Sequence, residues 1–157
     1  MSRTRLCRAI AMACSVALVG APHGAAATRP QAGVAGAATI KVTSTLSGSV
    51  LTNARGYVLF VFPKEGHHIT FCVKTKTCMT DWPAVTTVGR PIAGPGVNAA
   101  LLGTIPYKGK LRQVTYDGRP LHTYKFAYSA QSSVMNIGIK QFGGPWYALN
   151  ANGKIVK

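Results

Sequence analysis

The cysteines are the residues of this sequence that could form a covalent cross-link. Cys72 and Cys78 lie six residues apart, just before Trp82-Pro83, and two further cysteines, Cys7 and Cys14, lie near the N-terminus. Outside the cytosol, a disulfide is the default state of such a pair. Redox-active pairs favour the C-x-x-C spacing, and two thiolates alone rarely hold a metal. The spacing therefore predicts a structural disulfide between Cys72 and Cys78, worth about 2 kcal/mol of stability.

Side chains that could bind a metal ion lie just before this pair. Glu65, His67 and His68 fall within four residues, and imidazole is a ligand that Cu and Zn accept readily. Adjacent residues of a strand point to opposite faces, so only one of the two histidines would normally join a given site, unless a turn brings both inward. The competing interpretation is a polar hairpin tip with two exposed histidines. A Cu or Zn site here is one hypothesis; no other cofactor is predicted.

The acidic residues are too few for most hydrolytic chemistry. The chain has only Glu65, Asp81 and Asp117, whereas a glycosidase needs two acids across the scissile bond. Asp117 precedes Gly118 and is expected in a hairpin turn. No G-x-S-x-G sequence is present, and a cysteine nucleophile would need a free thiol beside a histidine. The sequence therefore predicts no catalytic residues and a protein that is not an enzyme.

Positive charge is the broadest feature of the composition. Eighteen lysines and arginines accompany three acids, which gives a formal net charge of +15. Such a protein attracts polyanions; nucleic acid would bind only non-specifically and with strong salt sensitivity. The predicted partners are anionic envelope polymers or lipid head groups, although the charges could also serve only as a solvated surface. The densest clusters are formed by Lys74, Lys76, Lys108, Lys110 and Arg112.

The N-terminus has the pattern of a secretory signal. Three arginines in the first eight residues precede an uncharged, mostly apolar run over 9–21, and Ala25-Ala26-Ala27 offers a cleavage site. The run is too short to span a membrane. We expect cleavage after residue 27, which leaves 130 residues with a net charge of +12, enough for one domain. An uncleaved anchor and lipidation at Cys14 are the alternatives. The predicted location is secreted or associated with the cell envelope.

The rest of the chain predicts β-structure. Residues 28–38, rich in Ala, Gly and Pro, predict a flexible lead-in, and the domain is expected over 39–157. No helical periodicity lasts for three turns, and short β-branched or aromatic runs are separated by turn signals. The run over 57–62 is wholly apolar, which indicates burial on both faces. The predicted strands are 40–43, 57–62, 68–73, 101–105, 111–116, 121–126, 134–139, 146–149 and 155–156, with one helical turn at 78–83.

Two stretches of the domain resemble each other. Gly56 to Phe62 matches Gly118 to Tyr124 at an offset of 62, with a turn glycine, a leucine three residues on, and aromatic-type residues at the fourth and sixth positions after the glycine. Trp82-Pro83-Ala84 matches Trp146-Tyr147-Ala148 at an offset of 64. Chance similarity between hairpins is the alternative. We therefore predict an all-β domain of antiparallel hairpins from two related halves, about 48–100 and 101–157.

In their order along residues 48–157, these motifs resemble the bacterial secreted-repeat lipoproteins of unknown function. The set is G-x-x-L-x-x-F, a cysteine pair before W-P, L-L-G-T-I, Q-V-T-Y-x-G-x-P-L and F-G-G-x-W-Y. The family signature is Y-x-[FWY]-x-x-D. Its positions hold Phe60, Phe62 and Glu65 in the first copy and His122, Tyr124 and Ala127 in the second. The resemblance implies the fold and export, and no established activity.

Overall fold

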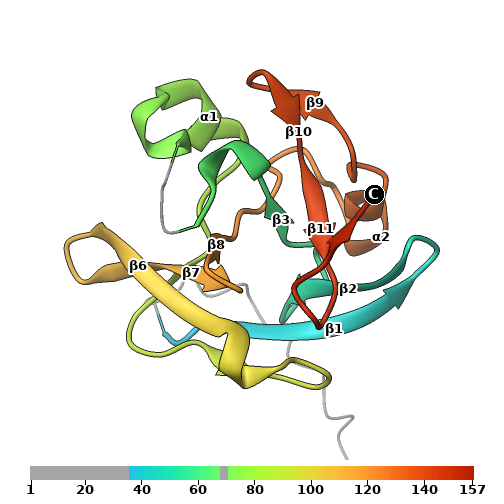
Figure 1. The fold of residues 1–157 in the computed structure, drawn as a ribbon, viewed down its shortest axis with the longest axis horizontal. Coiled ribbons are helices and arrows are strands. Elements are labelled where there is room, and N and C mark those ends of the chain that lie inside the picture. Colours follow the sequence, from blue (N-terminus) through green and yellow to red (C-terminus); the bar gives the residue numbers. More distant parts are fainter. Residues whose placement is uncertain (1–35, 68–70) are drawn as a thin grey trace, which may run out of the picture. The chain divides into compact units, whose positions relative to one another are not determined.

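The polypeptide folds into short strands arranged in small antiparallel sheets, as predicted (Figure 1). The computed structural model describes residues 36–67 and 71–157, so the predicted signal peptide lies outside the described residues. In chain order the strands are β1 (Thr39–Thr45), β2 (Gly48–Asn53), β3 (Phe60–Val61), β4 (Thr86–Thr87), β5 (Ile92–Ala93), β6 (Leu102–Lys108), β7 (Leu111–Tyr116), β8 (Arg119–Pro120), β9 (Lys140–Gln141), β10 (Gly144–Pro145), β11 (Tyr147–Leu149) and β12 (Ile155–Val156).

Helices are few and short in the described residues. The two α-helices are α1 (Lys76–Asp81) and α2 (Ala130–Val134), and the 3-10 turns are η1 (Pro63–Glu65), η2 (Cys72–Lys74) and η3 (Ala99–Leu101). Helix α1 ends just before Trp82-Pro83, close to the predicted helical turn, because proline disfavours a helical conformation in the residue before it. None of the described helices combines the length and the apolar character that crossing a membrane requires.

The strands of the described ranges form four sheets, with the strand orders β2-β1-β5, β12-β11-β3, β4-β7-β6 and β10-β9, and β8 also pairs with β7. Neighbouring strands are antiparallel, except for the two-residue pairing of β1 with β5. In Figure 1 the β1–β2 hairpin runs across the lower right half of the view, while α1 and the β9–β10 ribbon lie at the top. The predicted disulfide between Cys72 and Cys78 is confirmed, with the two Cα atoms 5.2 Å apart.

Two apolar cores lie on the two sides of the segment 58–62, whose residues are all buried. Successive side chains of an extended segment point to opposite faces. The prediction of burial on both faces is therefore confirmed. The first core contains Ile40, Leu51, Leu59, Val61, Val85, Val114, Tyr116, Leu121 and Leu149. The second core contains Val50, Val58, Phe60, Phe62, Cys72, Cys78, Trp82, Trp146 and Ala148.

The predicted strand over 57–62 is regular only at Phe60–Val61. It changes partners along its length: the Leu59 N–H donates to the Leu51 carbonyl, and Phe60 exchanges two backbone hydrogen bonds with His122. The predicted strand over 121–126 is also wrong as a continuation of the hairpin, since β8 ends at Pro120. The Leu121 N–H still donates to the Val114 carbonyl of β7, but residues 121–125 otherwise hydrogen-bond the segments around Phe60 and 81–85.

Two other predicted strands and the lead-in differ from the structure. The predicted strand over 68–73 is wrong at its described residues: Phe71 lies in a turn and Cys72–Lys74 form the 3-10 turn η2, because the short disulfide loop bends the chain there; 68–70 lie outside the described residues. The predicted strand over 134–139 is wrong: helix α2 begins at a capping box of Ser129 and Ser132, and turns follow it. In the lead-in, Gly36 to Ala38 hydrogen-bond residues near β4 and β5.

Tyr116 ties the first core to two distant turns. Its hydroxyl donates to the Ala151 carbonyl at 2.7 Å and accepts the Asn98 N–H at 3.0 Å, and the residue is fully buried. Burial raises the pKa of Tyr116 above its ordinary value of 10.0; the Asn98 hydrogen bond lowers it and the charge of Asp117 raises it further. Because the folded state holds the phenol proton more tightly than the unfolded chain, this stability is present below pH 10 and is lost above it.

We therefore predict that replacing Tyr116 by Phe reduces the alkaline loss of stability. The measurement is the free energy of unfolding in urea at about pH 8 and about pH 11. The wild type should lose more stability between these values than Tyr116→Phe does. Tyr128→Phe is the control, since Tyr128 is 89% exposed and should leave the pH dependence unchanged. Equal losses in all three proteins would contradict the assignment.

Candidate functional site

The basic residues singled out in the sequence lie on separate surface elements. Lys74 is exposed on η2, and Lys108 and Lys110 are exposed at the turn between β6 and β7. Arg112 is half-buried: its Nε donates to the Thr104 hydroxyl at 2.6 Å and its Nη2 to the Thr104 carbonyl at 3.3 Å. The side chain of Lys76 is not among those described. The lysines are therefore the available charges, and Arg112 is held against the sheet.

Two of the three acids are engaged within the fold. Glu65 is buried against His122, with Oε2 and Nε2 2.8 Å apart and no exposed side-chain surface on either residue. Asp117 accepts a hydrogen bond from Arg119 at 3.0 Å. The same guanidinium nitrogen donates to the Gly153 carbonyl at 2.8 Å. Asp81, the remaining acid, is half-buried at the end of α1. The acids therefore neutralise little of the surface charge.

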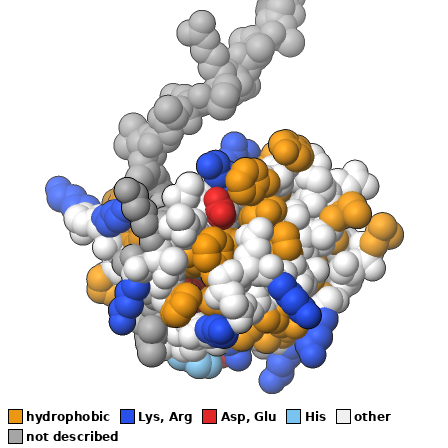
Figure 2. Space-filling view, turned by 90° about the horizontal axis from the view of Figure 1, so that it is seen from above, with side chains coloured by type: hydrophobic (Ala, Val, Ile, Leu, Met, Phe, Trp, Pro, Cys, Tyr) orange, Lys and Arg blue, Asp and Glu red, His pale blue; other side chains and the backbone are white. Residues whose placement is uncertain are grey.

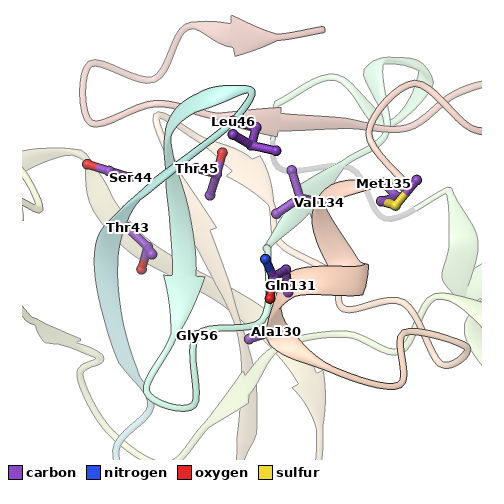
Figure 3. Close-up of a pocket in the computed structure, with 9 residues that line it drawn as sticks. All are labelled: Thr43, Ser44, Thr45, Leu46, Gly56, Ala130, Gln131, Val134 and Met135. Atoms are coloured by element: carbon purple, nitrogen blue, oxygen red, sulfur yellow. The ribbon is translucent and has the colours of Figure 1, made fainter.

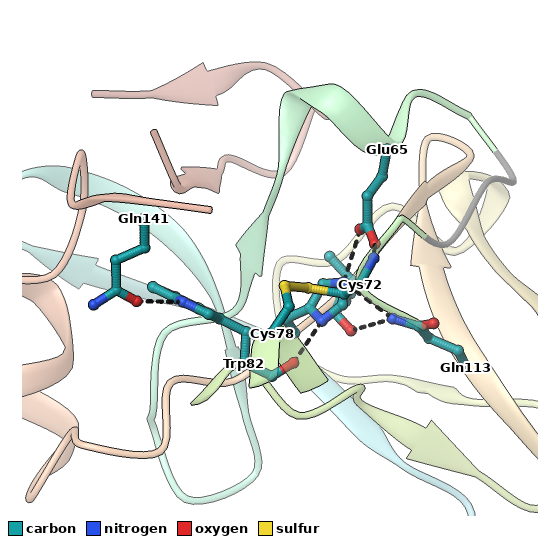
Figure 4. Close-up of a disulfide and its surroundings, with 8 residues drawn as sticks. Glu65, Cys72, Cys78, Trp82, Gln113 and Gln141 are labelled. Carbon is teal, nitrogen blue, oxygen red and sulfur yellow. Dashed lines mark hydrogen bonds and ion pairs between the residues drawn. A yellow bond between two sulfur atoms is a disulfide. The ribbon is translucent and has the colours of Figure 1, made fainter. Parts of the chain in front are cut away.

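A buried polar network surrounds Glu65 and His122 beside the disulfide (Figure 4). Glu65 Oε1 accepts the Cys72 N–H at 2.9 Å, and His122 Nδ1 lies 2.9 Å from the Trp82 carbonyl. The Gln113 amide nitrogen donates to the Leu121 carbonyl at 3.1 Å and lies 3.3 Å from His122 Nε2. These contacts join η1, the disulfide loop, α1 and β7 around one ion pair or hydrogen-bonded pair.

The partners of His122 determine where its protons lie. The Trp82 carbonyl can only accept, so Nδ1 carries a hydrogen. Nε2 faces Glu65 Oε2 at 2.8 Å, so a hydrogen between these two atoms joins the imidazole to the carboxyl group. Such a pair could transfer a proton to a substrate only if a substrate reached it. Because both side chains are fully buried, the network is suited to holding the fold together.

The predicted metal ligands are not brought together in the described part of the chain. Both carboxylate oxygens of Glu65 are engaged in the core, whereas His67 is exposed. His68 lies outside the described residues. Among the residues that are described, no group of three or more His, Cys, Asp or Glu side chains could hold a metal ion. The Cu or Zn site stays a prediction for His67 and His68. Glu65, a predicted metal ligand, instead binds the Cys72 N–H and His122 in the core.

A stack of four aromatic rings forms the centre of the second core. Trp82 and Trp146 lie parallel, with ring centroids 4.0 Å apart and an interplanar angle of 3°. Phe62 continues the stack on the Trp146 side at 4.7 Å, and Tyr124 continues it on the Trp82 side at 4.3 Å. Parallel stacked and edge-on ring pairs contribute about 0.5–1.5 kcal/mol each beyond the area they bury. The aromatic signature positions therefore build the core.

Residues matched in the sequence make matched contacts in space. Phe60 packs edge-on against Trp82 at 5.2 Å and 77°, and His122 packs edge-on against Trp146 at 5.2 Å and 83°. Phe60 and His122 also pair with each other across an antiparallel bridge. In addition, Phe60 pairs with Ala148, as His122 pairs with Ala84. The contacts of one half are thus repeated by the other around the Phe60–His122 bridge.

The Glu65–His122 pair was not expected from the sequence, although a signal for it was present. At the first signature position, one copy has Phe60 and the other has His122; at the acidic position, the copies have Glu65 and Ala127. One copy has a histidine in place of the aromatic residue, and only the other copy keeps the acid. These two differences from the signature are complementary, because an acid and a histidine can pair. Gln113 carried no such signal, because an amide in an alternating strand normally faces solvent.

We predict that replacing Glu65 or His122 alone lowers the free energy of unfolding substantially. Replacing both should lower it by less than the sum of the two single losses. Glu65→Ala leaves a buried imidazole and the Cys72 N–H without their acceptor, which should lower the free energy of unfolding by about 3–5 kcal/mol. Glu65→Gln should cost less, since an amide can still accept from Cys72 and donate to His122. Glu65→Ala with His122→Phe installs the residues found at the matched positions of the other half.

The measurement is urea unfolding of the oxidised protein for the four combinations of a double-mutant cycle. The expected coupling free energy is at least about 1 kcal/mol, with the double variant more stable than the two single losses would give. Strictly additive losses would show that Glu65 and His122 do not stabilise each other.

Comparison with protein-family models, curated proteins and solved structures finds no match to this chain. The resemblance to the secreted-repeat lipoproteins therefore stays a prediction.

Proposed function

We propose that this chain is a secreted, non-catalytic protein of the cell envelope that binds anionic surface polymers or lipid head groups through its basic surface. The observation that carries the proposal is the position of the acids. Glu65 is enclosed in the core and Asp117 is bound to Arg119, so neither of these acids neutralises the exposed lysines.

Exposed cations are distributed over many elements of the described fold. They are Arg55, Lys64, Lys74, Arg90, Lys108, Lys110, Lys125, Lys140, Lys154 and Lys157. On the face seen in Figure 2, blue basic groups lie around the rim and between apolar side chains, and acidic surface occupies little of it. A lysine or arginine near an anionic membrane contributes about 1 kcal/mol of binding free energy. A few such contacts therefore suffice for salt-sensitive retention on a charged surface.

Two features of the site support a role in binding over one in catalysis. The acid–base pair of the described residues, Glu65 and His122, has no exposed side-chain surface. The cysteines that could act as nucleophiles, Cys72 and Cys78, are joined to each other and fully buried. Export, which the N-terminal pattern predicts, fits both the disulfide and a target outside the cell.

We also infer that the domain arose from two related halves. The matched edge-on contacts of Phe60 with Trp82 and of His122 with Trp146 support this inference, as does the parallel pairing of Trp82 with Trp146. Duplication would give one core shared between two copies, with the exposed lysines outside the repeated positions free to vary.

The test is binding of the exported protein to vesicles of phosphatidylcholine with and without phosphatidylglycerol. We expect binding only to the anionic vesicles and release at about 0.5 M salt, where the screening length is only a few Å. Replacing Lys74, Lys108 and Lys110 together by Gln should weaken binding by about 100-fold if all three touch the surface. The same three replaced by Arg should bind like the wild type. Retention that ignores salt, or equal binding to neutral vesicles, would reject the proposal.

A further inference from the structure

A pocket of about 530 Å³ lies between the β1–β2 hairpin and helix α2 (Figure 3). Its volume is in the range of small-molecule sites. In the close-up, Thr45 and Leu46 of the hairpin lie across the pocket from Val134 and Gln131 of the helix. The lining residues are Thr43, Ser44, Thr45, Leu46, Gly56, Ala130, Gln131, Val134 and Met135.

Large apolar side chains stand at the mouth of this pocket without cover. Leu46 is fully exposed (104%) and Met135 is 87% exposed, in contrast to the buried leucines of the two cores. Their exposure costs the protein hydrophobic free energy unless a ligand covers them. Gly56 and Ala130 of the lining lie close together, since a Cβ added at Gly56 would be 3.3 Å from the Ala130 Cβ. The pocket thus combines this close contact with exposed apolar side chains.

The hydroxyl groups of the wall are already engaged inside the hairpin. Thr43 Oγ1 lies 2.8 Å from Thr52 Oγ1, and Thr45 Oγ1 donates to the Gly48 carbonyl at 2.7 Å. Ser44 Oγ is 3.4 Å from the hydroxyl of Ser49. The wall therefore offers a ligand mainly carbon surface and the exposed amide of Gln131. This surface fits a hydrocarbon chain better than a sugar or another polar group.

The charges next to the pocket are positive. Arg55 is exposed, directly precedes Gly56 in the chain, and holds its guanidinium 5.8 Å from the Tyr57 ring centroid. Lys41 is two residues before Thr43 on β1, so strand alternation places it on the same face of the hairpin. The lining contains no acid. A ligand with an apolar chain and an anionic head group would match both the walls and their surroundings.

We propose that this pocket binds one molecule of an anionic amphiphile, such as a fatty acid, with its acyl chain between the β1–β2 hairpin and α2. Arg55 and Lys41 then bind the head group, and Leu46 and Met135 cover the chain. The inference deepens the proposed function and rests on it for the anionic target, but it assigns a specific site in place of a diffuse charged surface.

The experiment is calorimetric titration of the exported protein with decanoate below the concentration at which decanoate forms micelles. We expect one saturable site, with weaker binding of butyrate, which lacks the chain, and of decanol, which lacks the charge. Leu46→Ser with Met135→Ser should weaken decanoate binding by about tenfold or more, because it removes the apolar cover. Both positions are exposed, so the fold should tolerate the change. Arg55→Gln should weaken binding by about threefold.

Matched variants separate this site from the general surface charge. Val88→Ser with Ile92→Ser changes two apolar residues that are also exposed, at 41% and 50%, and should bind decanoate like the wild type. Lys108→Gln with Lys110→Gln should weaken vesicle binding and leave decanoate binding unchanged. No saturable binding, or binding that the Leu46 and Met135 changes do not weaken, would overturn the pocket assignment. Salt-reversible vesicle binding would still stand in that case, whereas its absence would refute the proposed function separately.

Discussion

The buried pair of Glu65 and His122 is the interaction on which the rest of this fold depends. Enclosing two ionisable groups costs several kcal/mol unless their hydrogen bonds are satisfied, and here each has a second partner in the backbone: the Cys72 N–H for Glu65 and the Trp82 carbonyl for His122. The pair therefore positions the disulfide loop and the end of α1 against the segment that carries His122. It also removes one of only three acids from the surface, which connects the stability of the core with the positive charge outside.

Around this pair, the aromatic rings give the core a repeated geometry, and the pair is its main departure. Phe62, Trp146, Trp82 and Tyr124 stack in order, with equivalent positions on the two sides of the tryptophans. Stacked rings are tolerant of a change at one edge, since dispersion and burial do not depend on a single atom. A polar pair at one edge of such a stack can therefore pack against the rings. It also makes the two halves differ, because His122 has Glu65 as a partner and the matched Phe60 does not.

The sequence predicted the parts of this fold that local chemistry controls. The strand over 111–116, the Asp117-Gly118 turn and the Cys72–Cys78 disulfide follow from alternation, from residues that tolerate positive φ, and from redox environment; the φ angles of Asp117 and Gly118 are 49° and 71°. Long-range pairing decided the rest. The sequence predicts a hairpin strand at 121–126, but residues 122–125 bond to distant segments. The pocket beside α2 depends on a helix that begins at the Ser129 cap, just before the predicted strand over 134–139. Glu65 and His122 come from the two different halves, 57 residues apart. No short stretch of sequence contains both residues, so local patterns could not predict their contact.

Carboxyl labelling of the folded protein tests this account most directly. With a carbodiimide and an amine nucleophile, followed by peptide mass spectrometry, we expect Glu65 to remain unmodified in the native state while Asp81 and Asp117, whose side chain is 42% exposed, react. All of them should react at comparable rates once the chain is unfolded in urea. Labelling of native Glu65 as fast as Asp81 would mean that the carboxylate is on the surface, and would contradict both the buried pair and the explanation of the positive surface.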